Sequence, residues 1–221
     1  MEASALISMV PYDGEALQSE VKRYQTGVGS LMYAMTQTRP DLAFTVSCLS
    51  RFNHNPSPAH WKSLLRAIKY FGTTQNFGIR LGNLPVNTDP PARGLQTVNT
   101  DRELSFHGYS DSDYAGDIAT RRSTSGYVFF MAGGPISWKS ARQHAITLSS
   151  TEAEYYALTE AAKEAIWLQS LLFELGYKGK DLSPILIHGD NTGSLDLAEN
   201  PEHHQRAKHI NIRMHYIRQE V

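Results

Sequence analysis

Apolar residues recur every three or four positions in three stretches near the start of the chain, which is the spacing of one buried helix face. These stretches predict helices over residues 22–36, 40–52 and 58–72, the last with Ser57 as its N-terminal cap. A short apolar segment over 77–81 predicts a strand. The first part of the chain therefore predicts a small helical unit.

The pattern changes in the second half, where short runs of bulky and β-branched residues predict strands. The expected elements are strands over 105–111 and 126–131, a third strand region of 135–140 with 143–148, a helix over 151–175 and a strand over 185–188. The first three strands follow one another through short turns, which is typical of an antiparallel meander. The last strand is almost wholly apolar, so we expect it to be central and covered on both faces.

Residues 83–103 separate these two patterns. They contain prolines, asparagines and threonines without any apolar period, which is typical of a linker. The sequence thus predicts a helical domain over 1–82, a linker over 83–103 and an α/β domain over 104–221.

The composition narrows the function classes. A chain of 221 residues with 41% hydrophobic side chains can bury a sizeable core. Its 21 basic and 22 acidic residues give a net charge of -1, which excludes a globally basic nucleic-acid binder, so any such surface must be local. Cys48 is the only cysteine, which excludes an internal disulfide and a thiolate zinc cluster. Without a signal peptide or a run of about 18 apolar residues, a soluble protein with no membrane partner is expected.

Three acidic residues stand on the predicted rigid elements. Asp111 ends the first strand of the second half, Glu154 lies in the first turns of the long helix, and Asp190 follows the last strand. If they converge, their oxygens suit a hard cation such as Mg²⁺ or Mn²⁺. Two structural alternatives stay open: Thr151 and Glu154 have the spacing of a capping box, and Asp190 could cap a following helix.

The neighbouring acids are expected to have no part in such a site. Asp113 and Asp117 fit turn positions, and Glu152 lies two positions from Glu154 on the helix, which points it elsewhere, towards solvent.

Several segments resemble a known family in their order along the chain. They are residues 109–117, 123–127, 136–140, 149–155, 190–191 and 208–210. Together they resemble the ribonuclease H domain of copia-type LTR retrotransposon Pol polyproteins. Residues 29–33, 38–43 and 55–62 are similar to the segment that follows the polymerase palm in the same polyproteins, a thumb and connection region that grips primer and template.

The resemblance implies an α/β fold with a ribonuclease H-like mixed sheet, preceded by a small thumb- or connection-like helical domain. It implies that Asp111, Glu154 and Asp190 hold two Mg²⁺ or Mn²⁺ ions and that the substrate is the RNA strand of an RNA·DNA hybrid. The family continues beyond a segment like 208–220 into a last strand and a helix with a fourth carboxylate. We therefore expect an incomplete sheet, truncated at both ends relative to the family, and a weakly held second ion.

Further expectations concern partners and auxiliary residues. His209 is a candidate for assisting proton transfer. The candidates for nucleic-acid contact are Arg121, Arg122, Lys139, Arg142, Asn191, Arg206 and Lys208. The expected partners are the hybrid and either the rest of a reverse transcriptase or a second copy of the chain, inside the cell, in a cytoplasmic virus-like particle or the nucleus.

Two alternatives to a working nuclease remain. Because the polymerase palm and the fourth carboxylate are absent from the sequence, the chain could be a degenerate or domesticated fragment that binds nucleic acid or is purely structural. A transposase or integrase of the same superfold is the weaker alternative, since there two aspartates precede the glutamate, whereas here the glutamate comes second.

Overall fold

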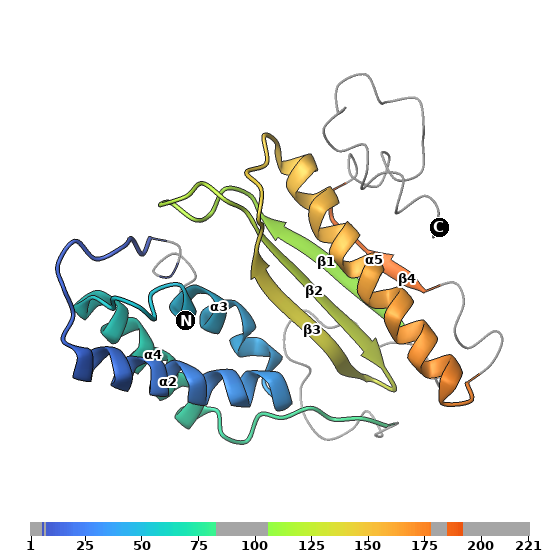
Figure 1. The fold of residues 1–221 in the computed structure, drawn as a ribbon. Coiled ribbons are helices and arrows are strands. Elements are labelled where there is room, and N and C mark those ends of the chain that lie inside the picture. Colours follow the sequence, from blue (N-terminus) through green and yellow to red (C-terminus); the bar gives the residue numbers. More distant parts are fainter. Residues whose placement is uncertain (1–5, 7, 83–105, 178–184, 192–221) are drawn as a thin grey trace.

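The computed structural model describes residues 6, 8–82, 106–177 and 185–191. Within them the protein is α/β: a group of helices lies beside a four-stranded mixed sheet, and one long helix crosses the sheet (Figure 1). We call residues 18–73 the helical unit and the four strands with their long helix the sheet unit. The predicted linker, 83–103, lies outside the described residues.

The helical unit contains the three predicted helices. They are α2 (Gln18–Gln37), the short 3-10 helix η1 (Pro40–Leu42) with α3 (Ala43–Ser50), and α4 (Pro58–Thr73). Ser57 caps α4 as predicted, because its hydroxyl accepts a hydrogen bond from the His60 amide. Gly27 lets α2 and α4 approach closely, since a Cβ there would lie 2.9 Å from a methyl group of Leu64. The shared core includes Tyr24, Val28, Leu31, Leu42, Val46, Leu49 and Leu64.

A buried arginine joins the ends of these helices. Arg39 is 2% exposed, and its guanidinium donates to both carboxylate oxygens of Asp41, at 2.9 and 2.7 Å, and to the carbonyl and hydroxyl of Thr74. The rings of Phe71 and Phe77 lie against it. The guanidinium is therefore both paired and hydrogen-bonded, as a buried charge must be.

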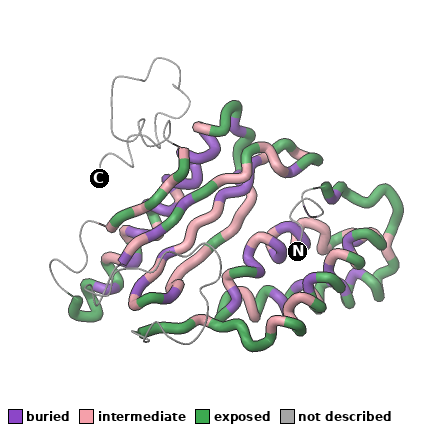
Figure 2. Tube along the Cα trace, turned by 180° about the vertical axis from the view of Figure 1, so that it is seen from behind, coloured by how far each residue is buried: buried purple, intermediate pink, exposed green. Residues whose placement is uncertain are grey.

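The sheet unit begins with the predicted meander. Its elements are β1 (His107–Asp113), β2 (Thr124–Met131), β3 (Gly134–Arg142), the helix α5 (Ser150–Glu174) and β4 (Leu186–His188). The strand order is β3-β2-β1-β4, with β4 parallel to β1 and the other pairs antiparallel. Helix α5 covers one face, where Phe129 packs with Ala161, Ala165 and Leu168. Figure 2, seen from behind, shows this buried layer between helix and strands.

Three expectations about strands are wrong. Residues 77–81 form no strand, because the chain leaves α4 in a tight turn in which the Phe77 amide bonds to the carbonyl of Thr74. Residues 143–148 form a loop instead of continuing β3. Its buried side chains bond to other elements, Gln143 to Ser125 and the carbonyl of Ala153, and these bonds replace a strand ladder.

The third error concerns β4. Among the described residues it is the edge strand of the sheet, and Leu186 is 58% exposed, so it is not covered on both faces. A continuous apolar run does not distinguish a central strand from an edge strand when it is only three residues long. The buried face of α5 ends before residue 175, where the predicted helix stops: Leu175 is exposed, and Gly176 turns the chain at φ 95°.

Side chains at the β3 edge hold the two units together. The Trp138 indole donates to the carbonyl of Met35 at 3.0 Å, and the Arg51 guanidinium lies 3.6 Å from the carboxylate of Asp117 and 3.3 Å from the hydroxyl of Thr124. Figure 1 shows α2 and α3 beside this edge. Not one of the described helices is both long and apolar enough to span a membrane.

We expect Arg39→Lys to lower the free energy of unfolding by about 2 kcal/mol, because a lysine ammonium cannot make the two-pronged contact with Asp41 and still reach Thr74. Arg66→Lys, at an exposed position on α4, is the matched control and should change little. Urea unfolding of both variants measures the difference, and equal stability of the two would contradict the structural role of Arg39.

Candidate metal centre

Three carboxylates from three elements meet at one end of the sheet. Asp111 lies near the end of β1, Glu154 on the first turns of α5, and Asp190 just after β4. One oxygen of each lies within 4.8 Å of the others. Glu154 is buried whereas Asp111 and Asp190 are exposed, so the cluster has a covered side and a side open to solvent.

The strand pairing explains why the two aspartates meet. β1 and β4 are parallel, and their register pairs Tyr109 with His188. Each aspartate follows two residues after that pair, so both reach the same end of neighbouring strands. Carboxyl ends of parallel strands are where α/β proteins place ligand-binding residues.

The start of α5 shows that Glu154 is not a capping residue. The hydroxyl of Ser149 accepts from the Glu152 amide at 3.1 Å, and the Glu152 carboxylate accepts from the Leu148 amide at 2.7 Å. The capping roles therefore belong to Ser149 and Glu152, each two residues before the expected Thr151 and Glu154. The expectation that Glu152 points to solvent is wrong, since it is 8% exposed.

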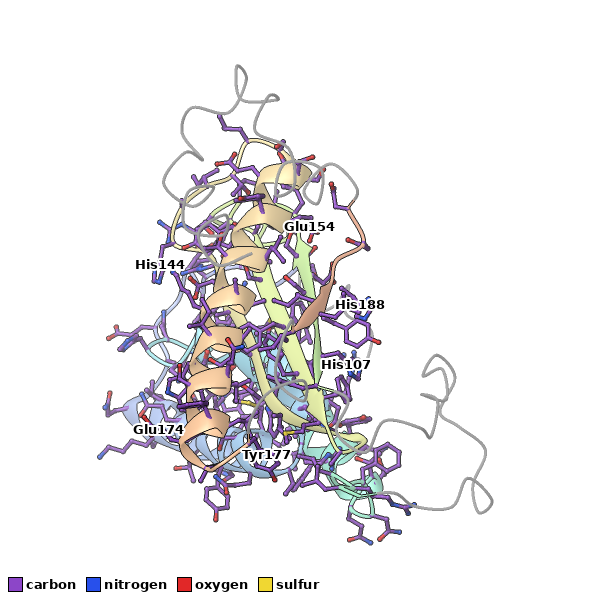
Figure 3. The ribbon with its side chains drawn as sticks, turned by 90° about the vertical axis from the view of Figure 1, so that its right-hand side faces the viewer. His107, His144, Glu154, Glu174, Tyr177 and His188 are labelled. Carbon is purple, nitrogen blue, oxygen red and sulfur yellow. The ribbon has the colours of Figure 1, made fainter. Side chains whose placement is uncertain are left out.

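Glu154 instead reaches the sheet through Ser112. Its Oε1 accepts from the Ser112 amide at 3.2 Å and from the Ser112 hydroxyl at 3.0 Å. Figure 3 shows Glu154 near the N-terminal end of α5, beside the strands. Ser112 was not predicted, although strand alternation gives the signal: it directly follows Asp111 and so faces the opposite side, towards the helix.

The electrostatics of the cluster favour a cation. Burial raises the pKa of Glu154, the charges of Asp111 and Asp190 raise it further, and the hydrogen bonds from Ser112 only partly oppose them. A divalent cation would remove this repulsion. The donor set consists of carboxylate oxygens alone, which is the set that Mg²⁺ and Mn²⁺ prefer, so the residues fit such an ion.

The neighbouring aspartates have structural surroundings. Asp117 is 6% exposed and bonds to Arg142, Arg51 and the hydroxyl of Thr120. It is thus the centre of an ion-pair network as well as a turn residue. Asp113 ends β1, where burial and then the charge of Asp111 raise its pKa.

The predicted nucleic-acid contacts do not form one cluster with the carboxylates. Arg122, Lys139 and Arg142 line a cleft at the β3 edge, and Arg121 is an exposed turn residue with φ 55°. Asn191 directly follows Asp190. The remaining predicted residues, Arg206, Lys208 and His209, lie outside the described residues.

Comparison with known proteins decides the family. The chain is 41% identical over 199 residues to the retrovirus-related Pol polyprotein from transposon TNT 1-94 of Nicotiana tabacum. The matched stretch covers 90% of this chain and 13% of that protein. It is 40% identical over 210 residues to the Pol polyprotein from transposon RE1 of Arabidopsis thaliana, again 13% of the relative. The chain belongs to the copia-type retrotransposon Pol polyproteins. The resemblance seen in the sequence motifs is thereby confirmed.

The chain corresponds to only a part of its Pol relatives. This Pol chain spans about 13% of the length of those polyproteins. It is also 43% identical over 145 residues to the secreted RxLR effector protein 161 of Plasmopara viticola, which covers 66% of this chain and 90% of that protein. No protein-family model and no solved structure matches this Pol chain.

Glu154→Gln is expected to stabilise the metal-free Pol chain near neutral pH. A carboxyl whose pKa is raised by folding favours the folded state below its unfolded pKa, and this contribution is lost as the pH rises through the folded pKa. The glutamine keeps the acceptor for Ser112 and cannot ionise, so its advantage should grow from acid to neutral pH in thermal unfolding.

Glu160→Gln, on the same helix, should behave in the opposite way. Burial works to raise the pKa of Glu160, but hydrogen bonds from Lys163 and Lys139 hold that pKa below its ordinary value. The ionised Glu160 carboxylate therefore stabilises the folded state above its unfolded pKa, and this stability is lost as the pH falls through the folded pKa. The same sign of change in both variants at neutral pH would contradict the account of Glu154.

Ser112→Ala is expected to weaken Mn²⁺ binding by about 10-fold, because one of the two hydrogen bonds that orient Glu154 is lost. Ser137→Ala is the matched control: the Ser137 hydroxyl makes the same kind of strand-to-helix bond, to Glu164 at 2.6 Å, away from the cluster. Calorimetric titration of both variants tests this, and an equal loss in the control would refute a specific role of Ser112.

Proposed function

We propose that this Pol chain is a metal-dependent ribonuclease H that cleaves the RNA strand of RNA·DNA hybrids by endonucleolytic hydrolysis. The observation that carries the proposal is the meeting of Asp111, Glu154 and Asp190, with oxygens within 4.8 Å of one another. Family membership and the mixed sheet with α5 across it support the same fold class, a ribonuclease H-like domain after a thumb- or connection-like helical domain.

The three carboxylates would hold Mg²⁺ or Mn²⁺. When bound, such ions supply the positive charge that activates a water and offsets the charge of the leaving oxygen in phosphodiester hydrolysis. The exposed Asp111 and Asp190 leave the open side of the cluster accessible to a phosphate group. Ser112 fixes one oxygen of Glu154, so the buried carboxylate keeps its position as a substrate approaches.

The negative charge of the cluster also explains a requirement for metal. Three carboxylates close together repel an approaching phosphate, and bound cations reverse that sign. The substrate class follows from the family resemblance: the 2′-hydroxyl distinguishes the RNA strand from the DNA strand of a hybrid. The proposal includes a domain division of 1–82, 83–103 and 104–221, and the rest of a reverse transcriptase as the partner.

Cleavage of a labelled RNA·DNA hybrid in Mg²⁺ or Mn²⁺ tests the proposal. Asp111→Asn, Glu154→Gln and Asp190→Asn should each lower the rate by at least about 100-fold, since each removes a negatively charged ligand. Glu174→Gln, at the exposed C-terminal end of α5, should keep the rate within about 2-fold. Activity of the unaltered chain that does not exceed the Asp111→Asn variant would refute catalysis.

Hybrid binding without cleavage is a second candidate. It is favoured by the cleft at the β3 edge, which Arg122, Lys139 and Arg142 line and which does not include the three carboxylates. Binding that weakens with salt in an otherwise inactive, folded chain would establish this function in place of the nuclease.

A further inference from the structure

A basic cleft lies between the two units. It is a cavity of about 630 Å³ bounded by α2, α3 and β3. Figure 1 shows these elements side by side. Its lining is apolar at Met32 and Met35 of α2 and at Trp138, and it is basic towards the end of β3. We call it the interunit cleft.

The charged residues that line the interunit cleft are all basic. They are Arg51, Arg122, Lys139 and Arg142, with His144 beside them, and no aspartate or glutamate belongs to the lining. The chain as a whole has a net charge of -1, so this grouping does not reflect a generally basic protein. A local surface of one sign attracts a ligand of the other.

The nearest carboxylates only partly neutralise these cations. Asp117 alone pairs with both Arg51 and Arg142, and Glu160 pairs with Lys139 at 3.3 Å. Arg122 makes no ion pair with any described residue. The charge of Arg51 also acts on the carboxylate of Asp113. Three guanidinium groups and two carboxylates therefore lie at this end of the cleft, which leaves one positive charge.

In two of these guanidinium groups the Nε atom also lacks a hydrogen bond. The Nε atoms of Arg51 and Arg122 are buried and have no partner among the described residues. A buried donor without a partner costs about 1–3 kcal/mol. A partner for these atoms would require the arginine side chains to reorient, and an anion in the interunit cleft favours such a change because arginine forks match phosphate oxygens in shape and charge.

The sheet register places the basic end near the carboxylate cluster. Asp113 pairs with Thr124, and Thr124 pairs with Arg142. Arg142 is thus two strand spacings, about 10 Å, from the end of β1 that carries Asp111. From there the cleft follows β3 towards Trp138, away from the cluster.

We propose that the interunit cleft binds a single-stranded extension of the hybrid whose duplex part occupies the carboxylate cluster. The proposal rests on the proposed function. The arginines contact the phosphates, and the apolar wall around Trp138 contacts the bases, as in other single-strand sites. A volume of about 630 Å³ falls within the range of small-ligand sites, about 300–1,000 Å³, which suits a short piece of one strand better than a duplex.

Fluorescence anisotropy with the Asp111→Asn variant separates binding from cleavage. We compare a blunt hybrid with the same hybrid carrying an overhang of about eight nucleotides, which is within the site sizes of single-strand binders. The overhang should increase affinity by about 10-fold. Arg122→Gln in the same background should abolish that gain. It should also reduce the slope of the logarithm of the binding constant against the logarithm of the salt concentration by about one. An overhang without effect would overturn the proposal.

Two further variants test whether the loss of affinity comes from the cleft or from a general change in the charge of the chain. Arg66→Gln removes an exposed charge on α4, far from the lining, and should leave the overhang gain intact. Met32→Glu adds a negative charge to the cleft at a position that is 40% exposed, so the fold should tolerate it, and it should remove the gain as Arg122→Gln does. Loss of the gain in Arg66→Gln, or its retention in Met32→Glu, would overturn the assignment.

Competition distinguishes a strand from an acidic protein partner. Single-stranded DNA should displace the overhang, whereas poly-glutamate at equal charge concentration should not; equal displacement by both would overturn the nucleic-acid assignment. Failure of cleavage with an intact overhang gain would refute only the nuclease, and cleavage without the gain would refute only the cleft.

Discussion

The sheet end is organised around the repulsion among three carboxylates that the fold holds together. Asp111, Glu154 and Asp190 would separate if their elements were free, and burial raises the pKa of Glu154 further. Apolar packing opposes this: small residues such as Ala157 and Ala161 let α5 lie close on the sheet, where Phe129 is fully buried. The free energy of apolar packing thus offsets the repulsion among the carboxylates, an arrangement typical of binding sites.

A polar network at the same sheet end fixes where α5 begins. The amide of Gln143 bonds to Ser125 on β2 and to the carbonyl of Ala153 in α5, and Thr147 bonds to Ser123. These bonds hold the loop that precedes the helix, so the position of Glu154 depends on the strands as well as on the helix. Buried polar networks of this kind specify one geometry because any broken bond leaves an unsatisfied group.

Periodicity predicted most of the elements, because helix and strand patterns are set by each element's own buried face. It could not predict contacts between elements. The run of Ser149, Ser150 and Thr151 offers several caps in a row, and only the loop contacts select Ser149, which transfers the capping role to Glu152. Proximity of the three acids required the parallel pairing of β1 with β4, which sequence spacing does not contain. The alternation of side chains along β1 indicates the face of Ser112, but its bonds to Glu154 depend on how α5 packs on β1.

The Asp117 network links the helical unit to the candidate site. Arg51 extends from the end of α3 to Asp117 and Thr124, and Arg142 at the end of β3 reaches the same carboxylate. Thr124 is the register partner of Asp113, two residues beyond Asp111. A change in how the helical unit packs on β3 would therefore displace charges that border the end of β1. Since these contacts are partly buried, their coupling is screened less by salt than that of surface pairs. The two units thus share one electrostatic environment. The pairing of β1 with β2 and of β2 with β3 fixes the distance between the basic cleft and the acidic cluster.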